Sequence, residues 1–115
     1  MKIEIKIARD FTKYPYGRFI KDHATSAESF IENIIIPALK NYNVEELEID
    51  LDDTEIGYSS SFLEEMSIRL FGFIINKGYT DKLKINFISK QDPSLLDEIE
   101  HYYQKYFAID IGYVS

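Results

Sequence analysis

Three consecutive serines, Ser59–Ser61, stand where an alternating acidic pattern gives way to a helical one. A serine hydroxyl at such a junction accepts a hydrogen bond from a backbone N–H that the first helical turn leaves unpaired. Glu64 follows Ser61 by three residues, the spacing of a capping box, in which each side chain bonds the other residue's backbone N–H. We therefore expect a helix over residues 61–77 that Ser61 caps, with the other two serines in the preceding turn.

Three acids around the end of the preceding strand are a second chemical candidate: Asp50, Asp52 and Asp53. Ligands of open sheets bind beyond the carboxyl ends of the strands, so these carboxylates could form a magnesium site or a phospho-acceptor cluster. Aspartate is also a common turn residue, and we favour a solvated turn. Glu98 and His101 have the spacing of half a di-iron site, but the sequence offers no second half. We expect neither a metal nor a cofactor.

Arg18, directly after Gly17, could bind a phosphate or a partner's carboxylate through its planar guanidinium group. It could equally pair with an acid of this chain, which we favour. The aromatic stretch FTKYPYG, residues 11–17, is a candidate binding loop whose rings could also tuck onto the core. His23 has no serine or cysteine at a recognisable spacing. Because no nucleophile–base pair, metal set or glycine-rich phosphate loop emerges from the sequence, we expect a protein that is not an enzyme.

The composition narrows the function classes further. The chain has 115 residues and no cysteine, so thiolate chemistry and disulfides are excluded and a reducing cytoplasm is a fitting location. The net charge of -7, with Lys and Arg scattered, argues against a nucleic-acid partner. No apolar run is long enough to be a signal peptide or a membrane span. We expect a cytoplasmic protein that binds neither nucleic acid nor membrane.

Periodicity predicts the elements that position these residues. Apolar and charged residues alternate around Ile3–Ile7, over residues 46–51 and around Leu83–Phe87, which predicts three strands. Arg18–Ile20 is expected to add a short strand antiparallel to the first. Apolar residues at helical spacing predict helices over residues 26–41, over 61–77 and from Pro93 onward.

Local signals predict how the helices begin and end. Thr25 and Glu28 form a second capping box. Pro37 lies inside the first predicted helix and should kink it or tighten its last turn, because proline lacks the N–H that would bond the carbonyl four residues back. Gly78 is placed to end the second helix.

This order of elements predicts one α/β domain over residues 1–115 with a mixed sheet. Strands covered on both faces would be continuously apolar, so the strict alternation indicates helices mainly on one face. The open face would carry an acidic central strand between lysine-bearing neighbours, which favours the spatial order 2-1-3-4. The tail, residues 107–115, has strand propensity and could add an edge strand or simply cover the core.

The strand IDLDD, leading through a serine-rich turn into a helix, together with the order of elements, resembles the STAS domain, the fold of anti-sigma-factor antagonists. A closer resemblance is to the bacterial STAS-like family of uncharacterised function. It is carried by Gly17-Arg18, by SAESF at residues 26–30 with Pro37-Ala38-Leu39, and most sharply by SSFLEE at residues 60–65. The resemblance covers nearly the whole chain to about residue 90.

In STAS antagonists a serine at the start of the second helix is phosphorylated by a kinase of the histidine-kinase-like ATPase fold, and the phosphate decides which partner is bound. The resemblance places Ser60 on that position, with Ser61, where a glycine is usual, as the other possible acceptor. A phosphate there gains from unpaired N–H groups and the helix dipole. The resemblance implies a regulatory protein–protein interaction domain whose binding surface includes these residues: Arg18, Gly57, Tyr58, Phe62 and Glu65.

Two other functions stay open. A small-molecule sensor could hold an anionic ligand such as a nucleotide beside Arg18 and the residues from Gly57 to Ser61. A subunit of a larger assembly could use the exposed sheet face and never change state. A sensor would bind its ligand alone, whereas a switch needs a kinase and a client protein. In the assembly subunit Ser60→Ala and Ser61→Ala would be silent.

Overall fold

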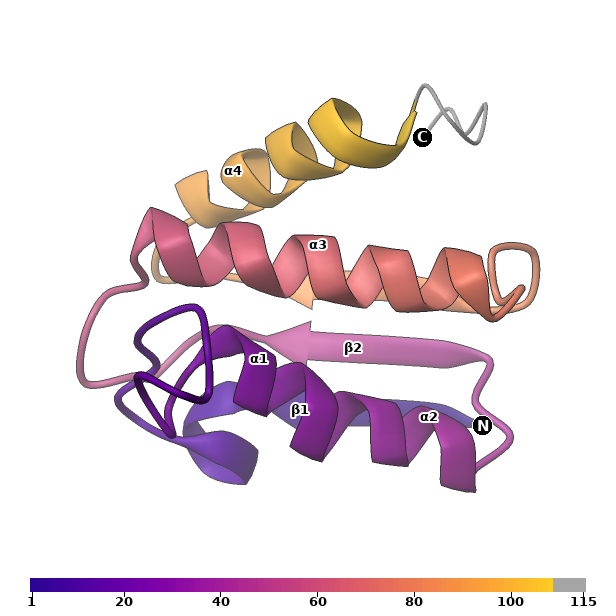
Figure 1. Cartoon of the computed structure of the whole chain (residues 1–115), viewed down its shortest axis with the longest axis horizontal. Helices are drawn as coiled ribbons and strands as arrows, with labels where there is room; N and C mark the ends of the chain where they lie inside the picture. The colour runs from indigo at the N-terminus through magenta and orange to yellow at the C-terminus, as the bar shows by residue number, and fades with distance from the viewer. Residues whose placement is uncertain (109–115) are drawn as a thin grey trace.

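A three-stranded parallel sheet forms the centre of the fold. Its strands are β1 (Lys2–Lys6), β2 (Glu46–Asp50) and β3 (Lys84–Ile88), in the spatial order β1-β2-β3. Figure 1 shows the computed structural model, which describes residues 1–108. The first, third and fourth predicted strands are confirmed as neighbours in that order, but all three run parallel. The α/β class is therefore confirmed.

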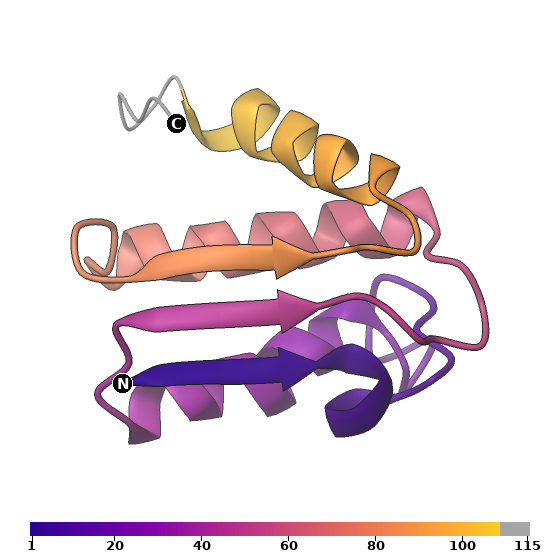
Figure 2. The same cartoon turned by 180° about the vertical axis from the view of Figure 1, so that it is seen from behind.

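The two faces of the sheet differ as the alternating sequence predicts. Helices α1 (Ala27–Phe30), α2 (Ile36–Asn41) and α3 (Ser60–Asn76) lie in front of the strands in Figure 1 and behind them in Figure 2. Since all three cover the same face, the apolar side chains of the strands are buried beneath them. Two cross-strand rows line this covered face: Ile3, Leu47 and Ile85, then Ile5, Ile49 and Phe87.

The opposite face of the sheet is polar, and opposite charges meet across the strands. Lys2 lies beside two acids of β2, with its Nζ 3.5 Å from Glu46 Oε2 and 3.4 Å from Glu48 Oε1. Lys6 Nζ lies 3.3 Å from Asp50 Oδ2. Exposed pairs of this kind contribute at most about 1 kcal/mol each. Their main effect is on register, because a shift of one residue would turn the charges toward the core.

The predicted second strand, Arg18–Ile20, is wrong: the segment is a loop that bends at Arg18 and enters a turn at Ile20. The carbonyls of Gly17 and Arg18 accept the backbone N–H groups of Ala27 and Glu28 at 3.0 Å, and the Ile20 N–H donates to Glu28 Oε1 at 2.8 Å. Arg18 O and Ile20 N–H are therefore bonded to the start of α1, and these two groups cannot pair with β1. No four-stranded mixed sheet of order 2-1-3-4 exists within residues 1–108.

The first helical unit begins one residue later than the sequence predicts. Ser26 caps α1, and its Oγ accepts the Ser29 N–H at 3.2 Å, so the capping box predicted for Thr25 and Glu28 is wrong. The unit continues through a π-helical turn, η2 (Ile31–Ile35), into α2.

Pro37 explains the π-helical turn. The Ile36 N–H bonds Ile31 O, five residues back, just before the proline that lacks an N–H. The sequence predicts a kink or a tightened turn at this place. The structure instead widens the turn, which is how π-bulges commonly accommodate a break in the hydrogen-bond ladder.

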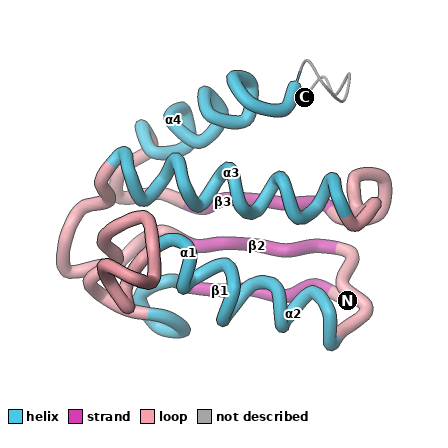
Figure 3. The backbone as a smooth tube through the Cα atoms, in the orientation of Figure 1, coloured by secondary structure: helices cyan, strands magenta, loops and turns pink. Residues whose placement is uncertain are grey.

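Two further helices complete the described residues. α3 ends at Asn76, and Gly78, two residues on, has a φ of +71°, the left-handed conformation predicted for the residue after a helix end. α4 (Ser94–Tyr103), extended by the π-helical turn η3 (Gln104–Ala108), packs against α3 and diverges from it, as Figure 3 shows. The core between sheet and helices has fully buried large side chains at its centre: Ile7, Phe30, Ile31, Ile35, Leu47, Ile49, Phe62, Leu63, Met66 and Leu70.

The structure describes only the first two residues of the predicted tail. The tail was predicted over residues 107–115, and residues 109–115 lie outside those that the structure describes.

Candidate functional site

The amino end of α3 is capped by Ser59. The Ser59 backbone is extended, and its Oγ accepts the Phe62 N–H at 3.1 Å. The capping box predicted for Ser61 and Glu64 is therefore wrong. Ser60 and Ser61 occupy the first two helical positions, where both are exposed. Their hydroxyls lie beside the positive end of the helix dipole and are not needed for the cap.

Ser60 differs from Ser61 in having neighbours on α4. Its side chain interacts with the Tyr102 hydroxyl, and that hydroxyl donates to Glu98 Oε2 at 2.7 Å. Burial raises the pKa of Tyr102, and the nearby Glu98 raises it further. The Tyr102 hydroxyl thus has Glu98 of its own helix and Ser60 at the start of α3 as polar neighbours.

Glu64 joins three separate parts of the chain. Its Oε1 lies 2.7 Å from Arg18 Nη2, and its Oε2 accepts the Tyr106 hydroxyl at 2.9 Å. The hydrogen bond from Arg18 lowers the pKa of Glu64, and the one from Tyr106 lowers it further. The loop before α1, the first turns of α3 and η3 are therefore held together at one carboxylate.

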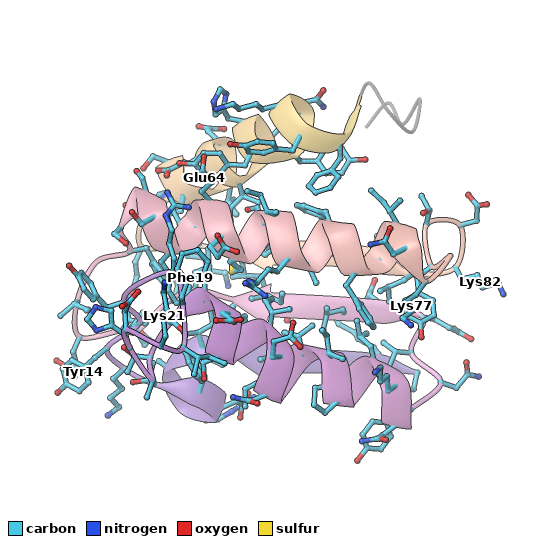
Figure 4. The ribbon with its side chains drawn as sticks, in the orientation of Figure 1. Tyr14, Phe19, Lys21, Glu64, Lys77 and Lys82 are labelled. Carbon is cyan, nitrogen blue, oxygen red and sulfur yellow. The ribbon has the colours of Figure 1, made fainter. Side chains whose placement is uncertain are left out.

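Arg18 and Arg69 share the next acid along α3. Glu65 Oε1 lies 3.7 Å from Arg18 Nη1, and Glu65 Oε2 accepts Arg69 Nε at 2.7 Å. Arg69 Nη2 also lies 3.3 Å from Glu28 Oε2 on α1, and the Arg69 guanidinium lies 6.0 Å from the centre of the Phe19 ring. Figure 4 shows that Phe19 and Glu64 both lie toward the end of the molecule where α3 begins. The favoured interpretation of Arg18, a pairing within the chain, is confirmed.

The remaining predicted contact residues differ in how far solvent or a partner can reach them. The Tyr58 hydroxyl donates to Leu51 O at 2.9 Å, and burial raises the pKa of Tyr58. Phe62 packs on the Tyr58 ring with centroids 5.6 Å apart and is completely buried, so it cannot touch a partner. Gly57 is exposed, with open space around its Cα. Of these residues, Gly57 alone is freely accessible.

The three acids around the end of β2 all have partners within the chain, but only Asp52 is buried. Asp52 is buried, and its two carboxylate oxygens accept the backbone N–H groups of Lys90 at 3.1 Å and Gln91 at 3.0 Å. Asp50 accepts the Asp52 N–H at 2.9 Å, and Asp53 Oδ2 lies 2.7 Å from Lys6 Nζ. No group of three or more ligating side chains in residues 1–108 could hold a metal ion. The solvated turn expected here is wrong for Asp52, which ties the loop after β2 to the loop after β3.

Each of the two histidines packs against a tyrosine ring. The His23 ring packs edge-on against Tyr16 at a centroid distance of 4.9 Å. A Cβ on Gly17 would lie 2.5 Å from His23 Cδ2, so this close approach requires glycine. His101 is exposed on α4, and its ring lies edge-on to the Tyr102 ring with centroids 5.6 Å apart. Glu98 on the same helix bonds Tyr102 instead.

Sequence reasoning missed the tyrosines that complete this site. In the helix predicted from Pro93 onward, Tyr102 and Tyr106 stand at helical spacing and count as apolar residues, yet their hydroxyls donate to Glu98 and Glu64. The residue type could have indicated these bonds, because a tyrosine on a buried helix face needs a hydrogen-bond partner for its hydroxyl.

The chain is thus an α/β domain with a polar network at the amino end of α3. No family model matches the chain, and no curated protein or solved structure matches it. Among residues 1–108, no helix combines the length and the apolar character needed to span a bilayer.

Proposed function

We propose that this chain is a STAS-like, cytoplasmic, non-enzymatic regulatory domain that works by protein–protein contact and switches partners when Ser60 or Ser61 is phosphorylated. The observation that carries the proposal is the capping of α3 by Ser59, which leaves both acceptor candidates exposed. A kinase can modify them without removing a hydrogen bond that the helix start requires. The expected partners are a histidine-kinase-like ATPase and a client protein.

The two serines would signal differently. A phosphate on Ser61 gains from the unpaired N–H groups of the helix start and changes the charge of an exposed surface. A phosphate on Ser60 would in addition lie beside Tyr102 and the Glu98 carboxylate. Repulsion from Glu98 would weaken the contact between α3 and α4. Phosphorylation of Ser60 therefore changes the packing of α4 as well as the local charge, which is a stronger switch.

Salt bridges within the chain hold part of the proposed recognition surface in a fixed arrangement. Arg18 and Glu65 are held by salt bridges, so a partner meets them as a fixed arrangement rather than as free charges. The same pairing weakens the sensor hypothesis, because an anionic ligand would have to take Arg18 from Glu64, 2.7 Å away. An assembly through the polar sheet face would likewise have to compete with the cross-strand pairs of that face.

Phosphosite mapping by intact-mass and peptide analysis, on protein purified from its native cells, tests the proposal. We expect one phosphate, which Ser60→Ala or Ser61→Ala abolishes. Ser94→Ala is the matched control, because Ser94 is an exposed serine at the first position of α4. A chain that stays unmodified across growth conditions, or a phosphate that only Ser94→Ala removes, would contradict the switch.

A further inference from the structure

Ser61 shares one face of α3 with a pair of glutamates. Glu64 follows it by three residues and Glu65 by four, and on a helix these are the spacings of neighbouring side chains. The Cα–Cβ bonds of a helix tilt toward its amino end, so both glutamates lean toward the turn that contains Ser61. Ser60 differs, because Glu65 lies five residues beyond it and on another face. Of the two acceptor candidates, Ser61 is therefore the one that has both acids as neighbours.

Arg18 reaches the same face of α3 from the loop before α1. Its Nη2 lies 2.7 Å from Glu64 Oε1 and its Nη1 lies 3.7 Å from Glu65 Oε1, so the guanidinium lies across the two acids. The Arg18 carbonyl accepts the Glu28 N–H at 3.0 Å, which fixes the backbone that carries this side chain. The Arg18 side chain is 34% exposed. A cation is thus held about one helical turn from Ser61, with part of its surface open.

A phosphate on Ser61 would be strongly attracted to this cation. It would add roughly two negative charges beside the carboxylates of Glu64 and Glu65. Like charges three or four residues apart destabilise a helix, and the helix dipole offsets only part of that cost. The planar guanidinium of arginine binds a phosphate in a bidentate manner. Because a phosphate carries more charge and more acceptor oxygens than a carboxylate, it competes with Glu64 for Arg18.

A phosphate attached to Ser61 also differs from a free anionic ligand. A free ligand must displace Glu64 from Arg18 at whatever concentration it has in solution. An attached group acts on Arg18 at an effective concentration on the order of millimolar or more. The ion pair that opposes binding of a free anion therefore does not exclude binding of a phosphate on the neighbouring turn.

We propose that Arg18 binds the phosphate on Ser61, and that its guanidinium moves from Glu64 to the phosphate when Ser61 is modified. This pairing rests on the proposed function, which supplies the phosphate, and adds the residue that binds it. Glu64 keeps the hydrogen bond from Tyr106 and loses its cation. Phosphorylation then changes the charge of the loop before α1 as well as that of α3, so a partner meets a change on two segments.

A phosphorus NMR titration of the full chain with phosphoserine installed genetically at position 61 tests the proposal. Arg18→Gln should raise the pKa of this phosphate by about half a unit or more, because the cation that favours the dianion is removed. Arg69→Gln is the matched control. Arg69 also pairs with Glu65, with Nε 2.7 Å from Oε2, but it lies about two helical turns beyond Ser61 and should change the pKa of the phosphate much less.

Two further variants exclude other assignments. Lys105 on η3 also lowers the pKa of Glu64, so it is a second cation near this face. If Lys105→Gln raises the pKa of the phosphate and Arg18→Gln does not, Lys105 binds the phosphate and the proposal is wrong. With phosphoserine at position 60 instead, Arg18→Gln should have a smaller effect. An equal effect at the two positions would overturn the assignment of Arg18 to Ser61.

Urea unfolding provides an independent readout. Arg18→Gln should lower the midpoint of unfolding more in the protein with phosphoserine at position 61 than in the unmodified protein, because the modified protein loses the stronger pair. An equal loss in both proteins would mean that Arg18 stays with Glu64, and it would overturn the proposal.

Failure of this pairing can be distinguished from failure of the proposed function. Genetic installation of phosphoserine needs no kinase, so an unmodified chain in native cells would contradict the proposed function and leave the titration result standing. A phosphate whose pKa does not depend on Arg18 would overturn the pairing, whatever phosphosite mapping finds.

Discussion

Arg18 and Glu64 form an ion pair 2.7 Å long that joins the loop before α1 to α3. Tyr106 bonds the other oxygen of the same carboxylate, so one acid connects segments that are distant in sequence. The pair is half-buried, which lets it contribute more than a surface salt bridge and leaves it partly screened by water. The pair also identifies the partner of Arg18. The sequence alone allowed either an external ligand or an acid of this chain.

Arg18→Gln should lower the free energy of unfolding by about 1 kcal/mol at neutral pH. Arg18 lowers the pKa of Glu64 below its ordinary value of 4.5, so the stabilisation is present above that value and is lost as the pH falls through the lower, folded-state pKa. Urea unfolding at neutral pH and near pH 3 should show a difference between wild type and variant that shrinks in acid. A difference that is equal at both pH values would exclude the ion pair as its cause.

Ser59→Ala should lower stability by about 1 kcal/mol, because it removes the hydroxyl that accepts the Phe62 N–H. Ser61→Ala is the matched control and should change stability by only a few tenths of a kcal/mol, since the Ser61 hydroxyl does not cap the helix. Thermal unfolding of both variants checks the assignment. A larger loss of stability in Ser61→Ala than in Ser59→Ala would instead support the capping box of Ser61 and Glu64.

Ser61→Asp should stabilise the protein slightly, because a negative charge near the start of a helix interacts favourably with its dipole. Ser60→Asp should gain less or destabilise, because the new charge lies near Glu98 through Tyr102. A double-mutant cycle with Glu98→Gln measures the repulsion, and Glu98→Gln should improve the stability of the Ser60→Asp protein more than that of Ser61→Asp. Equal effects of Glu98→Gln in both backgrounds would show that Ser60 is not coupled to α4.

Asp52→Asn should cost about 1–3 kcal/mol, because the amide group of asparagine would turn a donor toward one of the two N–H groups that the carboxylate accepts. Asp53→Asn is the control: Asp53 is exposed and has a φ of 71°, a conformation that asparagine tolerates. Denaturant unfolding should give a much smaller loss for Asp53→Asn. A loss for Asp52→Asn no larger than that of the control would contradict the structural role of Asp52.

The sequence by itself determined the elements with a clear period. Alternation in residues 46–51 predicted β2 together with its buried side, and the lysines and acids of neighbouring strands predicted their order. Gly78 predicted the end of α3 because few other residues adopt a positive φ at low cost. These are local properties, since side-chain spacing and backbone conformation act within a few residues.

Only the tertiary structure decided which groups the polar residues contact. The three residues Arg18–Ile20 were too short a pattern to specify a strand. In the structure Arg18 O and Ile20 N–H form hydrogen bonds with Glu28 at the start of α1. Glu64 has the spacing of a capping box, yet Arg18 and Tyr106 bind its carboxylate, and the cap moved to Ser59. A carboxylate bonds whichever donors folding brings within reach, and a cationic or buried donor from a distant segment outcompetes an exposed N–H nearby.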